Sequence, residues 1–259
     1  MARCRFALPL VLLLVSVLSA QNPPQSDPQA LSLVSQSMTA LTGGTSISDV
    51  TLSGTATWSN GTANETASAT LMAKGSGESR FDMTLSAGPR SEIRNDASTT
   101  SQGESLATDG SVNPWAYQNC LVNAAWFFPQ LSVLGATGES TLIFLYVGQE
   151  TRNGGTVWHI QSYRYSQSNT PTTRQLSTMD IYLDAATFLP SAFVFNVHPN
   201  NDSTQSIPVE VDFSAYQALS GVQVPFRIQR YVAGNLGFDL SVTSAQFNSG
   251  LPDSLFAIQ

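Results

Sequence analysis

Positive charge is scarce in this chain of 259 residues. It contains 11 Lys and Arg residues against 18 Asp and Glu residues, and Lys74 is its single lysine. The formal net charge is −7 at pH 7. Proteins that bind nucleic acids present basic patches to phosphate groups, so this composition argues against a nucleic-acid partner. Charged residues make up only 11% of the chain, which is low for a cytosolic surface.

Cysteine and histidine are equally rare. Cys4 precedes the first apolar run, so it cannot be the acylated cysteine of a lipoprotein signal, which follows such a run. Cys120 is the only other cysteine, and we expect it to be buried and inert, with a reactive thiol as the alternative. His159 and His198 are too far apart in sequence to form a recognisable metal motif. The sequence therefore predicts no metal site and no cofactor.

Only one long apolar run is present, and it lies at the N-terminus. Residues 7–18 read ALPLVLLLVSVL, after Arg3 and Arg5 and before Ser19-Ala20. This pattern predicts a secretory signal peptide over residues 1–20, and its removal would take the formal charge to −9. An uncleaved anchor is the alternative, but the run is shorter than the ~20 residues of a membrane span. We expect a soluble periplasmic or secreted protein without a stable membrane span.

Motifs for catalysis are also missing. The string KGSGES at residues 74–79 joins two predicted strands, whereas a hydrolase nucleophile elbow joins a strand to a helix. Asp184, Glu210 and Asp212 are expected mostly on the solvated face of strands, which does not favour paired catalytic carboxylates. The chain has neither a phosphate-binding loop nor a dinucleotide fingerprint. The sequence thus predicts a protein that is not an enzyme.

One amphipathic helix is predicted near the start of the mature chain. Ser26 or Asp27 can cap it, Pro28 suits its first turn, and Gly43-Gly44 ends it. Apolar residues recur at intervals of three and four, at Leu31, Val34, Met38 and Leu41. The spacing predicts a helix over residues 28–41 with one apolar stripe.

After this helix the apolar pattern changes to a period of two, which is typical of β-strands. Asn60-Gly61 and Asn153-Gly154-Gly155 are hairpin signals between such runs. We count about ten strands joined mostly by hairpins, which predicts one single domain over residues 21–259. The expected fold is mainly β (α+β), a curved antiparallel half-barrel with open edges. Pro225 places its strand at an edge or beside a bulge, because proline donates no ladder hydrogen bond.

The middle of the chain breaks the alternation and is rich in aromatic residues. Asn113-Pro114 opens it, and we expect helical structure over residues 114–128 that acts as a lid on the sheet. Cavities for apolar ligands are built from such side chains. The candidate ligand-binding residues are Trp115, Tyr117, Val122, Trp126, Phe128 and Leu131. We expect Trp126 to face the ligand together with Leu131 or Val122, and Phe127 to pack toward the sheet. The alternative is that these rings only plug the core.

Three stretches resemble a known family. They are MDIYLDAATFLPSAFVF at residues 179–195, FSAYQALSGVQVPFRIQRY at 213–231 and VTSAQFNSGLPDSLFAI at 242–258. With the N-terminal helix before a meander of strands, their order resembles the periplasmic outer-membrane lipoprotein carriers and sensors of the LolA/LolB/RseB-like group. The resemblance implies a half-barrel closed by helices over a hydrophobic cavity that holds acyl chains or another apolar ligand. The long aromatic insertion departs from that pattern.

Two hypotheses for the function follow. The first is a non-catalytic carrier or sensor that binds an acyl chain, a lipid or a lipoprotein in the cavity of the half-barrel. The second is a structural or interaction module whose half-barrel is filled by its own side chains and whose sheet edge pairs with an envelope protein. A cavity lined by Trp and Phe favours the first, whereas a packed interior with an exposed strand edge favours the second.

Overall fold

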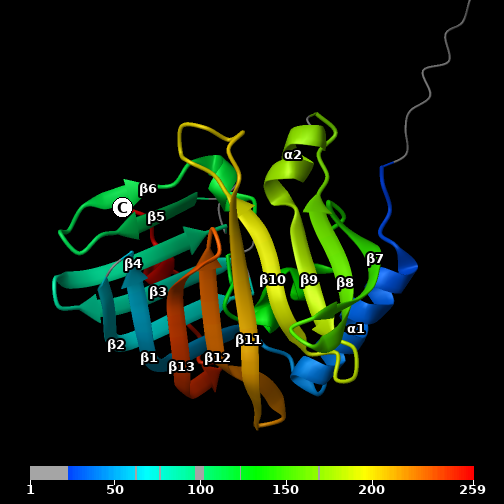
Figure 1. Ribbon diagram of the computed structural model, residues 1–259, viewed down its shortest axis with the longest axis horizontal. Helices are drawn as coiled ribbons and strands as arrows, with labels where there is room; N and C mark the ends of the chain where they lie inside the picture. The colour runs from blue at the N-terminus through cyan, green and yellow to red at the C-terminus, as the bar shows by residue number, and fades with distance from the viewer. Residues whose placement is uncertain (1–22, 62, 76, 97–101, 123, 169) are drawn as a thin grey trace, which may run out of the picture.

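A single antiparallel sheet dominates the structure (Figure 1). The computed structural model describes residues 23–259 except positions 62, 76, 97–101, 123 and 169. The predicted signal peptide lies outside the described residues. The strands are β1 (Asp49–Asn60), β2 (Ala63–Lys74), β3 (Glu78–Leu85), β4 (Gly88–Asn95), β5 (Gln102–Leu106), β6 (Val112–Pro114), β7 (Leu142–Arg152), β8 (Gly155–Arg164), β9 (Met179–Asp184), β10 (Pro190–Val197), β11 (Ile207–Leu219), β12 (Val222–Val232) and β13 (Asn235–Phe247). The helices are α1 (Pro28–Thr42) and α2 (Thr170–Ser177), with 3-10 turns η1 (Tyr117–Cys120), η2 (Pro129–Leu131), η3 (Val133–Ala136) and η4 (Asp253–Phe256).

Strands that follow one another in the chain are neighbours in the sheet, with one exception. The order is β6-β5-β4-β3-β2-β1-β13-β12-β11-β10-β9-β8-β7, and β1 pairs with β13 near the two ends of the chain. Consecutive pairing needs only short hairpins, as the sequence predicted. The exception is the step from β6 to β7, which form the two open edges. Residues 115–141, here called the cover segment, therefore run from one edge of the sheet to the other.

Helix α1 confirms the predicted helix almost to the residue. The side chain of Asp27 accepts a hydrogen bond from the backbone N–H of Gln29, and Gly43 ends the helix with a φ of 57°. That left-handed conformation suits glycine, which has no Cβ to clash. The buried stripe includes Val34 and Leu41 as expected, whereas Leu31 is only partly buried.

The core lies between the concave face of the sheet and the elements that cover it. Buried apolar side chains of most strands form one cluster with α1 and with residues 122–134 of the cover segment. Helix α1 contacts β7, β12, η2 and η3, and Figure 1 shows it along the β7 side of the sheet. The fold is the expected mainly β half-barrel, open at both edges.

The structure differs from the sequence prediction in three details. The described residues form thirteen strands where about ten were expected, and α2 was not predicted at all. Helix α2 has the sequence TPTTRQLS, in which threonine and serine favour turns over helices, so the pattern carried little helical signal. The predicted helix over residues 114–128 is replaced by the end of β6, by η1 and by irregular turns.

Hydrogen bonds from Arg94 hold the irregular path of the cover segment. The guanidinium of Arg94 in β4 donates to the backbone oxygens of Asn119, Cys120 and Val122. In an α-helix these oxygens would accept from N–H groups four residues further along. In this irregular segment Arg94 serves as a donor to them, and Phe128 is extended, with a φ of −133°. The structure also confirms that Cys120 is buried.

Pro225 lies in a locally unpaired part of an interior strand. Strand β12 pairs with β11 along its whole length, but its pairing with β13 begins only at Arg227. Residues 222–226 therefore have a ladder on one side only. The prediction that Pro225 lies in an edge strand or at a bulge is therefore wrong, because β12 lies inside the sheet and its register shift falls at Arg230 and Tyr231. Proline is tolerated here because this half of the strand pairs on one side only.

Candidate functional site

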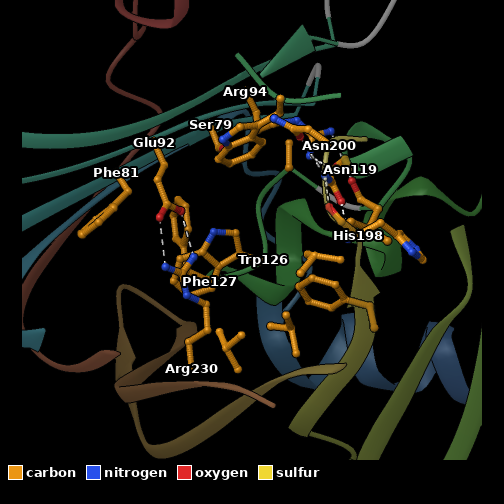
Figure 2. Close-up of a pocket in the computed structure, with 17 residues that line it drawn as sticks. Ser79, Phe81, Glu92, Arg94, Asn119, Trp126, Phe127, His198, Asn200 and Arg230 are labelled. Carbon is orange, nitrogen blue, oxygen red and sulfur yellow. Dashed lines mark hydrogen bonds and ion pairs between the residues drawn. The ribbon is translucent and has the colours of Figure 1, made fainter. Parts of the chain in front are cut away.

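A cavity of about 330 Å³ opens on the concave side, between the sheet and the cover segment. Both the sheet and the cover segment contribute apolar side chains to its walls. Those of the sheet are Phe81, Phe195 and Val209, and those of the cover segment are Val122, Trp126 and Phe127. Alternation along the strands places these sheet residues on the inner face, opposite the polar residues of the outer face. Figure 2 shows Trp126 and Phe127 side by side in this site.

An ion pair crosses the apolar part of the cavity. Both terminal nitrogens of Arg230 donate to Glu92, at 2.9 and 3.1 Å (Figure 2). Glu92 lies on β4 and Arg230 on β12, which are separated in the sheet by four other strands. The pair can form only because the sheet curves enough to bring β4 and β12 face to face. Burial by itself would raise the pKa of Glu92, but Arg230 and then Arg90 hold it below its ordinary value.

Aromatic rings surround the guanidinium of Arg230. Its central carbon lies 4.6 Å from the ring centre of Trp126, 5.9 Å from Trp58 and 6.0 Å from Phe238. A cation over an aromatic face is attracted by the electron density of the ring. Arg230 is therefore held by the carboxylate of Glu92, which binds its terminal nitrogens, and by the aromatic rings around its guanidinium.

A second arginine anchors the cover segment from the wall of the cavity. Arg94 reaches the three backbone oxygens described above at 3.1, 2.7 and 3.3 Å, and it lies 3.4 Å from Asp96. Its side chain passes over Gly103 of β5. A Cβ on that glycine would lie 2.7 Å from Arg94 Cδ and 2.6 Å from the ring of Trp115. Glycine at this position thus makes room for both side chains.

Two asparagines join the cover segment to the loop after β10. The amide of Asn119 donates to the backbone oxygen of His198 at 2.7 Å and accepts from the backbone N–H of His198 at 2.8 Å. The amide of Asn200, in the loop, donates to the backbone oxygen of Pro114 at 3.0 Å and accepts from the backbone N–H of Ala116 at 2.9 Å. We call Asn119 and Asn200 the amide clasp. Both line the cavity, as does His198 (Figure 2).

The structure divides the predicted ligand-binding residues among three environments. Trp115, Val122 and Trp126 line the cavity beside the ion pair. Tyr117 and Leu131 instead line a separate hollow of about 840 Å³, which also includes Met38 and Arg164. Phe128 is fully buried with its ring 6.1 Å from that of Phe247, and it lines neither space. Trp126 and Val122 therefore share a wall. Phe127, expected to pack toward the sheet, is fully buried and borders the cavity.

Sequence reasoning missed the polar half of this site. Arg230 has the same parity in β12 as the buried Ile228 and Val224, so a cation on an otherwise apolar face was the available signal. Glu92 and Arg94 alternate with the apolar Ile93 in β4, which was a weaker sign that charged side chains face the interior. The amide clasp could not be predicted, because its two asparagines are distant in sequence and lie in loops or turns.

Two kinds of feature are absent from the described residues. No group of three or more His, Cys, Asp or Glu side chains among them is placed to hold a metal ion. No helix in that part of the chain is both long enough and apolar enough to cross a membrane.

Comparison with solved structures identifies the architecture. A LolA superfamily protein from Nitrosomonas europaea superimposes with a TM-score of 0.55 at 11% identity, covering 88% of this chain and 97% of that one. The chain has the LolA-like fold. A DUF1329 family protein from Desulfovibrio piger gives a TM-score of 0.56 at 10% identity, with 90% and 98% covered. A domain from Vibrio parahaemolyticus, described as an outer membrane lipoprotein-sorting protein, gives 0.55 at 11% identity, with 88% and 96% covered.

At these identities the likeness concerns the fold alone, and it confirms the fold that the sequence resemblance implied. Neither a protein-family model nor a curated protein sequence matches the chain.

Proposed function

We propose that this protein is a non-catalytic periplasmic or secreted binding protein that holds an apolar ligand in the cavity of its half-barrel. The observation that carries the proposal is the aromatic and aliphatic lining contributed jointly by the sheet and the cover segment. A volume of about 330 Å³ lies at the lower end of the range for small-molecule sites. The charged side chains of the cavity are bound to one another or to the backbone, which suits binding better than catalysis.

An acyl chain is the ligand that we favour. Each buried methylene contributes roughly 0.8 kcal/mol, so part of one chain supplies useful affinity. One protein with the same fold is described as lipoprotein-sorting, which supports a lipid or the acyl chain of a lipoprotein as the ligand. The proposal includes the cleaved signal peptide over residues 1–20 and a single domain over residues 21–259.

A second function is favoured by a different observation. Phe127 and Phe128 are fully buried, so the cover segment fills much of the concave side. Strand β7 is an edge strand of 11 residues, whereas β6, the other edge, has three. The side chain of Val147 in β7 is 54% exposed. These features support an interaction module whose β7 edge pairs with an envelope protein.

Binding of the neutral apolar dye N-phenylnaphthylamine to the purified protein tests the two functions. If the cavity takes apolar ligands, the dye fluoresces on binding, and Trp126→Ala weakens its affinity severalfold with a small loss of stability. Trp158→Ala is the matched control, because Trp158 is a partly buried tryptophan outside the cavity. A parent protein that binds no dye, or a Trp126→Ala effect no larger than the control, would favour the interaction module.

A further inference from the structure

The polar groups of the cavity are of two kinds, and their arrangement bears on the chemistry of the ligand. Ser79, Asn119, His198 and Asn200 lie toward one side together with Arg94, away from the pair of Glu92 and Arg230 (Figure 2). The ionisable groups of the lining apart from His198 are Glu92, Arg94 and Arg230. The question is whether any of these three charges is free to bind a charged ligand.

Neither cationic group is without an acceptor. The two terminal nitrogens of Arg230 are both bound to Glu92, and its faces contact Trp126 at 4.6 Å and two other rings. Turning toward another anion would break these contacts. The terminal nitrogens of Arg94 donate to three backbone oxygens that hold the cover segment in place, and Asp96 lies 3.4 Å away. Its Nε is buried and makes no hydrogen bond to the described residues.

Glu92, the one carboxylate of the cavity lining, faces two arginines. Glu92 accepts two hydrogen bonds from Arg230 and lies 3.4 Å from Arg90, which itself stacks on Trp58 at 4.0 Å. A ligand cation would have to compete with both arginines for it. Moving a charged group out of water without a free counter-charge is costly, and the cost is larger in an apolar site.

The amide clasp, in contrast, can form further hydrogen bonds without a charged partner. Each amide of the clasp bonds to two backbone groups, and Asn119 also donates to Asn200 Oδ1 at 3.4 Å. These contacts use three of the four positions of each amide, which has two N–H donors and two acceptor positions. Groups of this kind can exchange hydrogen bonds with a hydroxyl or an amide at no electrostatic cost. They also border the apolar wall formed by Val122 and Trp126.

We infer that the ligand of this cavity is an amphiphile with an uncharged head that bears hydroxyl or amide groups. The inference rests on the proposed binding function and specifies the class of ligand. The head lies at the amide clasp, and the aliphatic tail lies against Trp126 and Phe127. Fatty acid anions and lipids with cationic heads bind more weakly.

Three amphiphiles with similar twelve-carbon tails test this inference on the purified wild-type protein. They are 1-monolauroylglycerol, laurate and dodecyltrimethylammonium, each kept below its micelle concentration and measured by calorimetry and by displacement of N-phenylnaphthylamine. We expect the neutral ligand to bind at least about tenfold more tightly than either ion, which corresponds to ~1.4 kcal/mol. Laurate or the cation binding as tightly as monolauroylglycerol would overturn the inference and leave the binding function standing. If none of the three ligands nor the dye binds, the binding function itself fails.

One variant makes the test directional. Glu92→Gln removes the carboxylate that lies between Arg230 and Arg90. Because the two arginines then lack this counter-charge, the preference for monolauroylglycerol over laurate should become smaller or reverse. Asp239→Asn is the matched control, because Asp239 holds Arg227 in a bidentate pair outside the cavity, at 3.1 and 2.8 Å. An unchanged preference in folded Glu92→Gln, verified by circular dichroism, contradicts the role of paired charges. If that variant does not fold, the three-ligand series on the wild type decides alone.

Discussion

The two faces of strand β12 carry the same chemical pair in different surroundings. On the concave face Arg230 binds Glu92 of β4, and on the convex face Arg227 binds Asp239 of the adjacent strand β13. The side chains of the concave pair are 14% and 10% exposed, whereas those of the convex pair are 51% and 21% exposed. The concave pair connects strands far apart in the sheet, and the convex pair connects neighbours.

The effect of an ion pair on stability therefore depends more on its burial and on the strands that it connects than on its hydrogen-bond geometry. Exposed ion pairs contribute about 0–1 kcal/mol, because water screens the charges. A buried pair is not necessarily stabilising relative to apolar residues, but removal of one partner leaves an unpaired buried charge. The concave face should therefore be sensitive to substitution and the convex face tolerant.

The largest effect is expected in the packed interior beneath the cover segment. Phe128→Ala should lower the free energy of unfolding by about 3–5 kcal/mol, because Phe128 is fully buried against Phe247 and cannot be replaced by water. Urea unfolding followed by fluorescence measures this loss. Tyr231→Ala on the convex face is the control, and an equal loss there would break the comparison of the two faces.

An effect of similar size is expected for the concave ion pair. Glu92→Gln should lower the free energy of unfolding by about 3–5 kcal/mol, because Arg230 and Arg90 then lack their carboxylate. The measurement is again urea unfolding at pH 7. A loss below about 1 kcal/mol would mean that water reaches Arg230 as freely as it reaches Arg227.

A pH effect is expected from the convex face. Burial, and then the neighbouring Glu210, raise the pKa of Asp212 to about 6. The folded protein therefore holds a proton that the unfolded chain releases near pH 4, so this carboxyl destabilises the fold increasingly as pH rises from about 4 to 6. Asp212→Asn should stabilise the protein by around 1–2 kcal/mol at pH 7 and by little at pH 4. A stability difference that is the same at both pH values would contradict the assignment.

The smallest effect is expected for the convex ion pair. Asp239→Asn should change the free energy of unfolding by less than about 1 kcal/mol, and salt should reduce the difference further. Unfolding at low and at high ionic strength measures it. A loss comparable to that of Glu92→Gln would remove the distinction between the faces on which the other predictions depend.

Much of the fold could be predicted because its signals are local. Asp27, Pro28 and Gly43 mark the ends of α1 through contacts within a few residues, and Asn153-Gly154 marks a hairpin. Alternation along each strand decides which side chains face inward, since the pleat repeats every two residues. Consecutive hairpins then lead to one open antiparallel sheet.

The candidate site could be predicted only in part. We expected Trp126 to face the ligand together with Leu131 or Val122; Val122 lines the cavity beside Trp126, whereas Leu131 lines the separate hollow. The surroundings of Phe128 could not be predicted, because the expectation treated residues 114–128 as helical, whereas the orientation of each ring in an irregular chain depends on contacts made elsewhere.

By itself the sequence determined the helix, the strands and the inner face of the sheet, because these depend on residues close together in the chain. The curvature of the sheet, the partner of Arg230 and the use of Arg94 by the cover segment were decided only in the tertiary structure. Glu92 and Arg230 are 138 residues apart, and no local pattern states that β4 faces β12. Their approach follows from the twist accumulated over the intervening strands, and so does the cavity that they cross.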